Sequence, residues 1–213
     1  RPELNCFIEI CADRAMDEAR EAERALMAGE ATGALHGLPF SVKDLVATEG
    51  VRTTFGTVMM KDNITEKDAI SVKRLRDAGA ILIGKTTTPE FGSKGFTDSP
   101  LFGRTRNAWS ASRTSAGSSG GAAVAVAAGI GPLVVATDGG GSTRIPAAAN
   151  GVVGIKQTIG LVPHDAAQDV IGNQTYVTPT TRNVADTALM LQAMAGEASC
   201  DPWSFGHQTQ FPV

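Results

Sequence analysis

The chain has 213 residues, of which 42% are hydrophobic and 19% are charged, and its formal net charge is −3. This balance is typical of a globular domain or of a large piece of a longer protein. Lys and Arg form no run, so the sequence lacks the basic patch that nucleic-acid binding requires.

Apolar periodicity along the chain predicts alternating helices and buried strands. Amphipathic spacing marks the helices, and short apolar runs followed by turn residues mark the strands. This alternation is typical of the α/β class. In chain order we expect a helix over residues 9–29, a strand over 38–42, a helix over 69–78, a strand over 81–85, a long loop over 90–113, a helix over 122–128, strands over 133–136 and 152–155, a helix over 184–195 and an aperiodic tail over 196–213.

Several of these elements have recognisable ends. The first strand is expected to end at Lys43, and Asp44 is expected to cap the turn or helix that follows. Asp68 is the expected N-cap of the second helix, and Gly79 is its expected stop. The loop over 90–113 is longer than an ordered loop usually is without a functional role. We therefore expect that loop to serve the glycine-rich segment that follows it.

Two glycine-rich turns that contain serine dominate the middle of the chain, over residues 113–121 and 137–144. Gly accounts for 24 of the 213 residues, a share above the usual ~7%. Apolar runs separate the two turns, so we expect specialised loops rather than disorder. In the second turn, three glycines precede Ser142, and their uncovered N–H groups would bind an oxyanion beside a serine nucleophile. The expected oxyanion donors are the backbone N–H groups of Gly139, Gly140, Gly141 and Ser142.

A phosphate-binding loop is the main alternative interpretation of these turns, because glycine-rich turns before helices bind phosphate. Neither G-x-x-x-x-G-K-[ST] nor a G-x-G-x-x-G after a clean strand is present. A flexible linker is also disfavoured, since apolar segments adjoin both turns. The sequence therefore favours a catalytic role for the serines.

Lys43 is the best candidate for the base that such a serine needs. A serine hydroxyl is a weak nucleophile until a base takes its proton, and no histidine lies in a comparable turn. Lysine can act as a base when an apolar pocket lowers its pKa. The Lys43 side chain is not expected to reach Ser142, so a hydroxyl that both donates and accepts, from Ser118 or Ser119, would relay the proton. His36, which precedes the same strand, is interpreted as structural and is the first alternative base.

The remaining charged and sulfur-containing residues predict no further site. Asp138 and Arg144 flank the second turn and are expected to form a structural ion pair. The cysteines are odd in number and contain no C-x-x-C pair, so we expect reduced, buried thiols of a cytosolic protein and neither disulfides nor zinc. The histidines lack the spacing of metal ligands. These residues are Cys6, Cys11 and Cys200, and His36, His164 and His207.

No membrane span or targeting segment is expected. The longest apolar stretch, residues 122–136, is interrupted by two glycines and a proline. The chain begins at Arg1 with neither Met nor a signal peptide, so we expect that it is clipped at its start.

Taken together, the motifs resemble those of the amidase signature family. The resemblance extends from about Asn5 to about Pro202 and therefore covers nearly the whole chain. It rests on the two serine turns and on a set of supporting stretches. These are Gly37-Leu-Pro-Phe-Ser-Val-Lys-Asp44, Thr97-Asp-Ser-Pro-Leu-Phe-Gly103, Gly117-Ser-Ser-Gly-Gly121, Gly140-Gly-Ser142, Arg144-Ile-Pro-Ala147, Gly151-Val-Val-Gly-Ile-Lys156 and Thr178-Pro-Thr-Thr-Arg-Asn-Val-Ala-Asp186.

The resemblance implies a Ser–cis-Ser–Lys triad. Ser142 would be the nucleophile, Lys43 the general base and Ser118, after a cis peptide bond, the bridge between them, with Ser119 in support. It implies an amide hydrolase that forms an acyl-enzyme, acts on a small amide substrate in the cytoplasm and uses no metal or organic cofactor. No contact with nucleic acid or a membrane is expected, and a homodimer is left open.

The resemblance also implies a fold and its extent. We expect an α/β/α layered fold with a mixed central sheet that is present only in part, because the family domain is much longer. Residues 1–213 would be a partial domain with its catalytic core over about 37–160, a final helix over about 184–195 and the C-terminal half missing. The chain departs from the common family pattern at Ala116, Asn150 and Gln157, which lie outside the expected triad.

Two other functions stay open. The first is the glutaminase (A) subunit of a glutamyl-tRNA(Gln) or aspartyl-tRNA(Asn) amidotransferase, which residues 172–177 argue against mildly. The second belongs to another class, a truncated non-catalytic remnant or binding module. The presence of Lys43, Ser118 and Ser142 argues against this second alternative.

Overall fold

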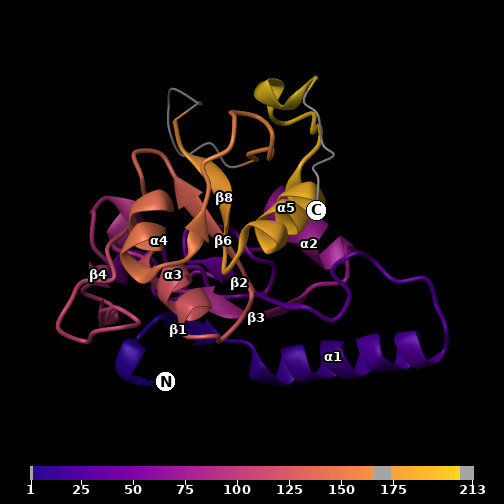
Figure 1. Ribbon diagram of the computed structural model, residues 1–213, viewed down its shortest axis with the longest axis horizontal. Helices are drawn as coiled ribbons and strands as arrows, with labels where there is room; N and C mark the ends of the chain where they lie inside the picture. The colour runs from indigo at the N-terminus through magenta and orange to yellow at the C-terminus, as the bar shows by residue number, and fades with distance from the viewer. Residues whose placement is uncertain (1, 166–173, 207–213) are drawn as a thin grey trace.

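A six-stranded mixed sheet forms the centre of the described part of the chain (Figure 1). The computed structural model describes residues 2–165 and 174–206. Strands β3, β2 and β6 are parallel, whereas β1, β8 and β7 pair antiparallel with their neighbours. The expected mixed α/β sheet is thereby confirmed. In spatial order, the strands are β1 (Phe7–Ile10), β3 (Ile81–Thr86), β2 (Pro39–Lys43), β6 (Leu133–Asp138), β8 (Tyr176–Thr181) and β7 (Val153–Gly154).

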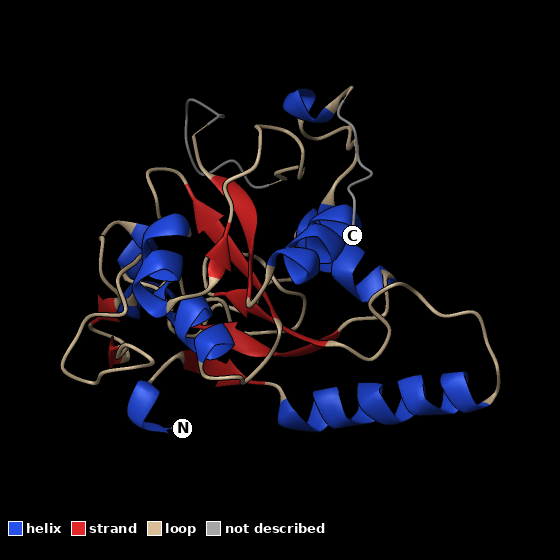
Figure 2. Cartoon of the chain, in the orientation of Figure 1, coloured by secondary structure: helices blue, strands red, loops and turns tan. Residues whose placement is uncertain are grey.

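Helices cover both faces of this sheet, as the cartoon in Figure 2 shows. Helices α3 (Gly120–Ala127) and α4 (Arg144–Asn150) pack on one face. Helices α2 (Ile70–Asp77) and α5 (Val184–Met194) pack together on the other. Helix α1 (Ala12–Met27) lies beside β3 with none of its residues buried. The shorter elements are η1 (Pro2–Leu4), η2 (Val58–Met60), η3 (Glu90–Gly92), β4 (Asp98–Ser99), β5 (Gly103–Arg104) and η4 (Pro202–Ser204).

The alternation of side chains along the parallel strands separates two cores. On the face toward α2 and α5, Phe40 and Val42 of β2 join the largest buried cluster. On the opposite face, Val134 and Ala136 of β6 pack against small residues of α3. Helix α3 also lies close to the end of β3, where it requires glycine: a Cβ atom at Gly121 would lie 2.4 Å from the side-chain oxygen of Thr87, the residue that follows β3.

The carboxyl ends of two adjacent parallel strands meet at one edge of the sheet. Strand β2 ends at Lys43, and β6, which pairs with it through Val42 and Val135, ends at Asp138. In open α/β sheets this edge is where ligands bind. The fold therefore places the two sequence segments of chemical interest side by side.

Three expectations about secondary structure are wrong. Residues 9 and 10 belong to β1 instead of the first helix, and Ile10 pairs with Gly84. Strand β8 was not expected at all. Asp68 does not cap α2, because the helix begins one residue later than expected and has Ala69 at its N-cap.

Long-range contacts explain the error at Asp68. Its carboxylate accepts a hydrogen bond from the Glu49 N–H and forms an ion pair with Arg76 at 3.0 Å. The Ile70 N–H at the start of the helix donates instead to Asp165. A local capping rule cannot anticipate either partner.

Other expectations have mixed outcomes. The loop over 90–113 contains the β4–β5 hairpin and η3.

All three cysteines are free, but only Cys6 is buried, and Cys200 is exposed. The expectation of buried thiols is therefore wrong for Cys200 and for Cys11, which is only partly buried. Among the residues that the structure describes, no helix has the length and apolar character needed to cross a membrane. His207, the end of the tail and residues 172 and 173 lie outside the described residues.

Candidate active site

Lys43 lies at the end of β2 with its side chain completely buried. Its Nζ atom donates hydrogen bonds to the hydroxyl oxygens of Ser118 at 2.7 Å, Ser119 at 2.8 Å and Thr137 at 2.8 Å. Burial lowers the pKa of Lys43 from 10.5 to about 7, although the negative charge of Asp138 opposes this shift. A lysine in this state can accept a proton near neutral pH.

Ser118 and Ser119 lie in the first glycine turn, immediately before α3. The peptide bond between Gly117 and Ser118 is cis, and Ala116 before it has a positive φ of 57°. A Cβ atom at Gly117 would lie 2.8 Å from the backbone of Phe96, so only glycine fits there. The long loop over 90–113 thus packs against the turn that holds the two serines.

A backbone hydrogen bond joins the two serine turns. The Ser119 N–H donates to the carbonyl oxygen of Ser142 at 3.0 Å. The Ser119 hydroxyl also contacts the Thr137 carbonyl oxygen at 3.2 Å. These contacts fix the second turn relative to the first and to Lys43.

Asp138 organises the second turn. Its carboxylate accepts from the Gly141 N–H at 2.7 Å, from the N–H groups of Thr143 and Arg144, and from the Arg144 guanidinium at 2.9 Å. Burial alone would raise the pKa of Asp138, but these hydrogen bonds, led by that of the Arg144 side chain, lower it to about 2. The expected structural ion pair between Asp138 and Arg144 is therefore present.

One of the four expected oxyanion donors already has a hydrogen-bond acceptor in this arrangement. The Gly141 N–H is already donated to Asp138. Within the part of the chain that the structure describes, no acceptor is bonded to the N–H groups of Gly139, Gly140 or Ser142. In the described structure the N–H groups of Gly139, Gly140 and Ser142 are therefore free, whereas that of Gly141 already has an acceptor.

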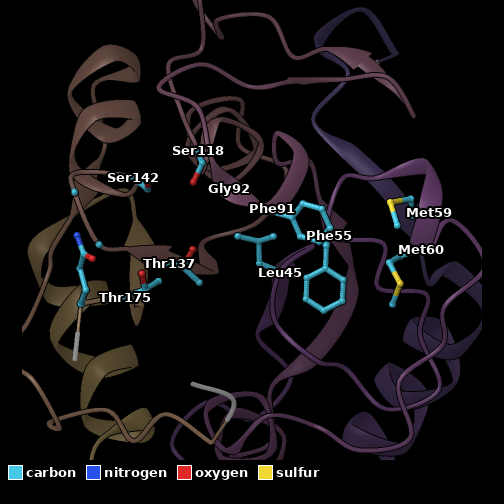
Figure 3. Close-up of a pocket in the computed structure, with 13 residues that line it drawn as sticks. Leu45, Phe55, Met59, Met60, Phe91, Gly92, Ser118, Thr137, Ser142 and Thr175 are labelled. Atoms are coloured by element: carbon cyan, nitrogen blue, oxygen red, sulfur yellow. The ribbon is translucent and has the colours of Figure 1, made fainter. Parts of the chain in front are cut away.

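Ser118 and Ser142 face a common cavity of about 680 Å³. Figure 3 shows Ser142 and Thr137 on one side of this cavity and an apolar wall on the other, with Ser118 and Gly92 between them. No hydrogen bond joins the Ser142 side chain to a described residue, and the three partners of Lys43 do not include it. The lining residues are Leu45, Phe55, Met59, Met60, Phe91, Gly92, Ser118, Thr137, Gly139, Gly140, Ser142, Gln174 and Thr175.

Two parts of this site were not predicted from the sequence. Thr137 is the third hydroxyl around Lys43, and its position at the end of a buried strand next to the turn was the available signal. The apolar wall comes from loops without periodicity, so no pattern identified Phe55, Met59 or Phe91. Gly92 approaches the serine closely, since a Cβ there would lie 3.3 Å from the Ser118 hydroxyl oxygen.

The other candidate residues have structural contacts. His36 bonds through Nε2 to the carbonyl oxygen of Ala22 and does not line the cavity. Asp44 accepts from the backbone and side chain of Thr54, as expected for a turn cap, and burial raises its pKa. Asn150, one of the departures from the family pattern, is buried and donates to the Ser115 carbonyl oxygen.

In residues 2–165 and 174–206, no group of His, Cys, Asp and Glu is placed to hold a metal ion.

Comparison with known proteins finds amidases and amidotransferase subunits among the relatives of this chain. The family model described as Amidase matches residues 1–209. An acylamidase of Rhodococcus erythropolis is 48% identical over 203 residues, which are 95% of this chain and 43% of the relative. The A subunit of the glutamyl-tRNA(Gln) amidotransferase of Alkaliphilus metalliredigens is 41% identical over 201 residues, which are 94% of this chain and 41% of the relative.

Solved structures agree. A bacterial aryl acylamidase of the amidase signature family superposes with a TM-score of 0.91 at 37% identity, over 96% of this chain and 43% of that one. The native peptide amidase of Stenotrophomonas maltophilia has a TM-score of 0.90 at 38% identity, over 97% of this chain and 43% of that one. The chain therefore spans less than half the length of the relatives that it matches.

Proposed function

The chain belongs to the amidase signature family, and on that basis we propose that the protein containing it hydrolyses small amides through an acyl-enzyme on Ser142. The observation that carries this proposal is the buried Lys43. Its amine lies 2.7 Å from the Ser118 hydroxyl oxygen, which faces the same cavity as Ser142. A lysine held among hydroxyls without an anion in contact is suited to gain and lose a proton.

In the proposed acylation step, neutral Lys43 takes the proton of the Ser118 hydroxyl while Ser118 takes the proton of Ser142. The Ser142 oxygen attacks the amide carbonyl carbon. The resulting oxyanion accepts hydrogen bonds from the free backbone N–H groups of the second turn, as in other acyl transfers. The positive charge on Lys43 then lies close to the developing negative charge.

Breakdown of this intermediate reverses the proton path. Ser118 donates its proton to the amide nitrogen and regains one from Lys43, and the carbon–nitrogen bond breaks. Ammonia or an amine leaves, and the acyl group stays on Ser142 as an ester. Water then attacks the ester carbonyl carbon with the same base, which releases a carboxylic acid and restores Ser142.

A second candidate is the glutaminase subunit of an amidotransferase, which the 41% identity to the A subunit of such an enzyme supports. In that case the released ammonia would pass to a partner protein. A gene for that partner beside this one, or a complex that copurifies with the protein, would favour it. Fluorophosphonate labelling of Ser142 would exclude the non-catalytic alternative.

The proposal is tested by labelling the complete protein with a fluorophosphonate and locating the adduct by mass spectrometry. We expect the adduct on Ser142, turnover of at least one small amide, and loss of both in Ser142→Ala. Ser112→Ala, which alters an exposed serine, is the matched control and should be labelled normally. Full labelling of Ser142→Ala would refute the assignment of the nucleophile.

A further inference from the structure

We propose that Lys85 is a positioning residue that fixes one side of the cavity that Ser118 and Ser142 face. It acts through the segment that connects β2 to η2, the β2–η2 loop (residues 44–57). This inference rests on the proposed function, and it gives a role to a second buried lysine that the proposed reaction does not use. The contacts of Lys85, the course of the loop and the separate anchoring of Lys43 support it.

Lys85 and Lys43 project from opposite faces of the sheet. In the parallel pairing of β2 with β3, Lys85 lies opposite Val42, whereas Thr86 lies opposite Lys43. Val42 belongs to the core on the side of α2 and α5, and side chains alternate between the two faces along a strand. The side chain of Lys85 therefore lies on the side of α2 and α5, where it is completely buried.

The Lys85 ammonium group makes three hydrogen bonds, and all of them are to the β2–η2 loop. Its Nζ atom donates to the Val46 carbonyl oxygen at 2.5 Å and to the hydroxyl oxygens of Thr48 at 2.9 Å and Thr53 at 2.8 Å. The two hydroxyls donate their own protons to the carbonyl oxygens of Val46 and Val51, so their lone pairs remain available to Lys85. A buried ammonium group requires such acceptors, and here one loop supplies all three.

This anchor is charged at neutral pH. Burial lowers the pKa of Lys85 to about 8, and the negative charge of Asp44 opposes that shift. Hydrogen bonds from a charged donor are stronger than those between neutral groups. Asp44 is itself buried at the start of the same loop, so loss of Lys85 would also leave a buried carboxylate without this compensating charge.

The anchored loop forms one side of the cavity. Leu45 and Phe55 line the cavity, and Figure 3 shows both of them on the side opposite Ser142. The three acceptors of Lys85 lie between these two residues in the chain. Beyond them, the Asp44 carboxylate accepts from the Thr54 N–H at 3.1 Å, and the Phe55 N–H donates to the Asp44 carbonyl oxygen at 3.0 Å. Lys85 thus holds the middle of the loop, and Asp44 holds its end.

Phe55 extends this anchoring to a second loop that lines the cavity. Its ring is stacked on that of Phe91, with the centroids 6.4 Å apart and an interplanar angle of 27°. The Phe91 N–H donates to the Phe55 carbonyl oxygen at 2.8 Å. Phe55 has a positive φ of 55°, which aromatic residues rarely adopt, and such a conformation persists only where the surrounding structure fixes it. The position of both rings therefore depends on how firmly the β2–η2 loop is held.

The candidate base is anchored by other elements. The Nζ atom of Lys43 donates to Ser118 and Ser119 of the first serine turn and to Thr137 of β6. None of these three residues belongs to the β2–η2 loop. Removal of Lys85 should therefore change the shape of the cavity while the proposed proton path stays intact. The expected result is weaker binding with little change in the chemical step.

The test measures how the rate of fluorophosphonate labelling of the complete protein depends on probe concentration. The concentration at half-maximal rate reports binding, and the maximal rate reports the reaction of Ser142. Lys85→Met should raise the half-maximal concentration about 10- to 100-fold, while the maximal rate and its pH midpoint change little. Lys73→Met is the matched control, because it replaces an exposed lysine of α2, and it should alter neither quantity.

A second variant tests the hydrogen bond itself. Thr53→Val removes one acceptor of Lys85 and keeps a branched side chain at that position. It should raise the half-maximal concentration less than Lys85→Met does, and the double variant should bind the probe no more weakly than Lys85→Met alone. Additive losses in the double variant would overturn the inference, because they would show that the two residues act independently.

Hydrogen exchange separates a local effect from a general loss of stability. In Lys85→Met, exchange of the Phe55 N–H should accelerate by a larger factor than exchange of the Ser119 N–H, which is bonded to the Ser142 carbonyl oxygen. Equal acceleration at the two positions, or unchanged probe binding in Lys85→Met, would overturn the inference.

The two measurements also distinguish this inference from the proposed function. If wild-type protein is labelled on Ser142 and Lys85→Met binds the probe as wild type does, the inference is wrong and the proposed function stands. If wild-type protein is not labelled on Ser142 but exchange at Phe55 accelerates selectively in Lys85→Met, the proposed function is wrong and the anchoring of the loop by Lys85 stands.

Discussion

The Nζ atom of Lys43 lies 2.7 Å from the hydroxyl oxygen of Ser118, and both side chains are buried. Its other two hydrogen-bond partners, Ser119 and Thr137, are also neutral hydroxyls. A charged ammonium group without an anion in contact is costly to bury, which is why burial lowers the pKa of Lys43 to about 7. The position of this lysine thus determines its chemistry.

Replacing Asp138 should shift the pH dependence of Ser142 labelling. The negative charge of Asp138 raises the pKa of Lys43 against the effect of burial. Asp138→Asn should therefore lower that pKa, and the rising limb of the labelling rate should move to lower pH. Measuring the rate from about pH 5 to about pH 9 would define the midpoint.

Arg144→Gln is the control for this variant. It disrupts the same ion pair but keeps the charge of Asp138, so the midpoint should not move to lower pH. A shift of equal size and direction in both variants would show that disorder of the turn, and not the charge, is responsible.

Replacing Ala116 with glycine should leave the free energy of unfolding nearly unchanged or raise it. Ala116 has a φ of 57°, a conformation that costs L-residues about 1–2 kcal/mol. Glycine removes this strain, but its greater unfolded-state freedom costs about 0.5–1 kcal/mol. Ala148→Gly, at an exposed position in α4, should lose about 1 kcal/mol because it has no strain to relieve. Urea unfolding measures both, and equal losses would argue against strain at Ala116.

Stability should rise with pH because of two buried lysines. Lys85 is fully buried, with its Nζ atom 2.9 Å from the Thr48 hydroxyl oxygen and 2.8 Å from that of Thr53. Burial lowers its pKa from 10.5 to about 8, and that of Lys43 from 10.5 to about 7. Between these lowered pKa values and the ordinary value of 10.5, the unfolded chain therefore binds more protons than the folded protein. The free energy of unfolding then increases with pH, by at most about 1.4 kcal/mol per pH unit for each lysine.

This rise in the free energy of unfolding should be clear between about pH 7 and about pH 9. Above about pH 9 the Cys6 thiol acts in the opposite direction, because burial raises its pKa from 9.0 to about 11. Lys85→Met should flatten the rise but not abolish it, because Lys43 remains. Urea unfolding at several pH values tests this, and an unchanged slope in Lys85→Met would contradict the lowered pKa of Lys85.

Local sequence patterns predicted the three parallel strands, β2, β3 and β6. The runs that end at Lys43 and Lys85 are short and apolar, and each is followed by a turn or loop. Strand β8 escaped prediction because Pro179 interrupts its pattern. The structure accommodates this proline because β7 is only two residues long and pairs with Thr180 and Thr181. Among the described residues, no strand therefore pairs with β8 on that side at Pro179.

The candidate site was predictable where chemistry requires particular residues in particular turns. The two serine turns and Lys43 met this condition, and their side chains gather at one edge of the sheet. The commitment of the Gly141 N–H to Asp138 was not predictable, because it depends on how the turn bends back on the carboxylate. The stacking of Phe55 on Phe91 also depends on tertiary contacts between separate loops.

The central claim is that Lys43 is the base that activates Ser142, and the pH dependence of fluorophosphonate labelling tests it most directly. In wild-type protein the labelling rate should rise with pH and reach half its maximum near the pKa of Lys43, about 7. Lys43→Ala should label several orders of magnitude more slowly and without this rising limb. Lys43→Arg should recover little, because arginine stays protonated and cannot accept the proton. If Lys43→Ala retains the same rising limb at a comparable rate, another group is the base and the proposed role of Lys43 is wrong.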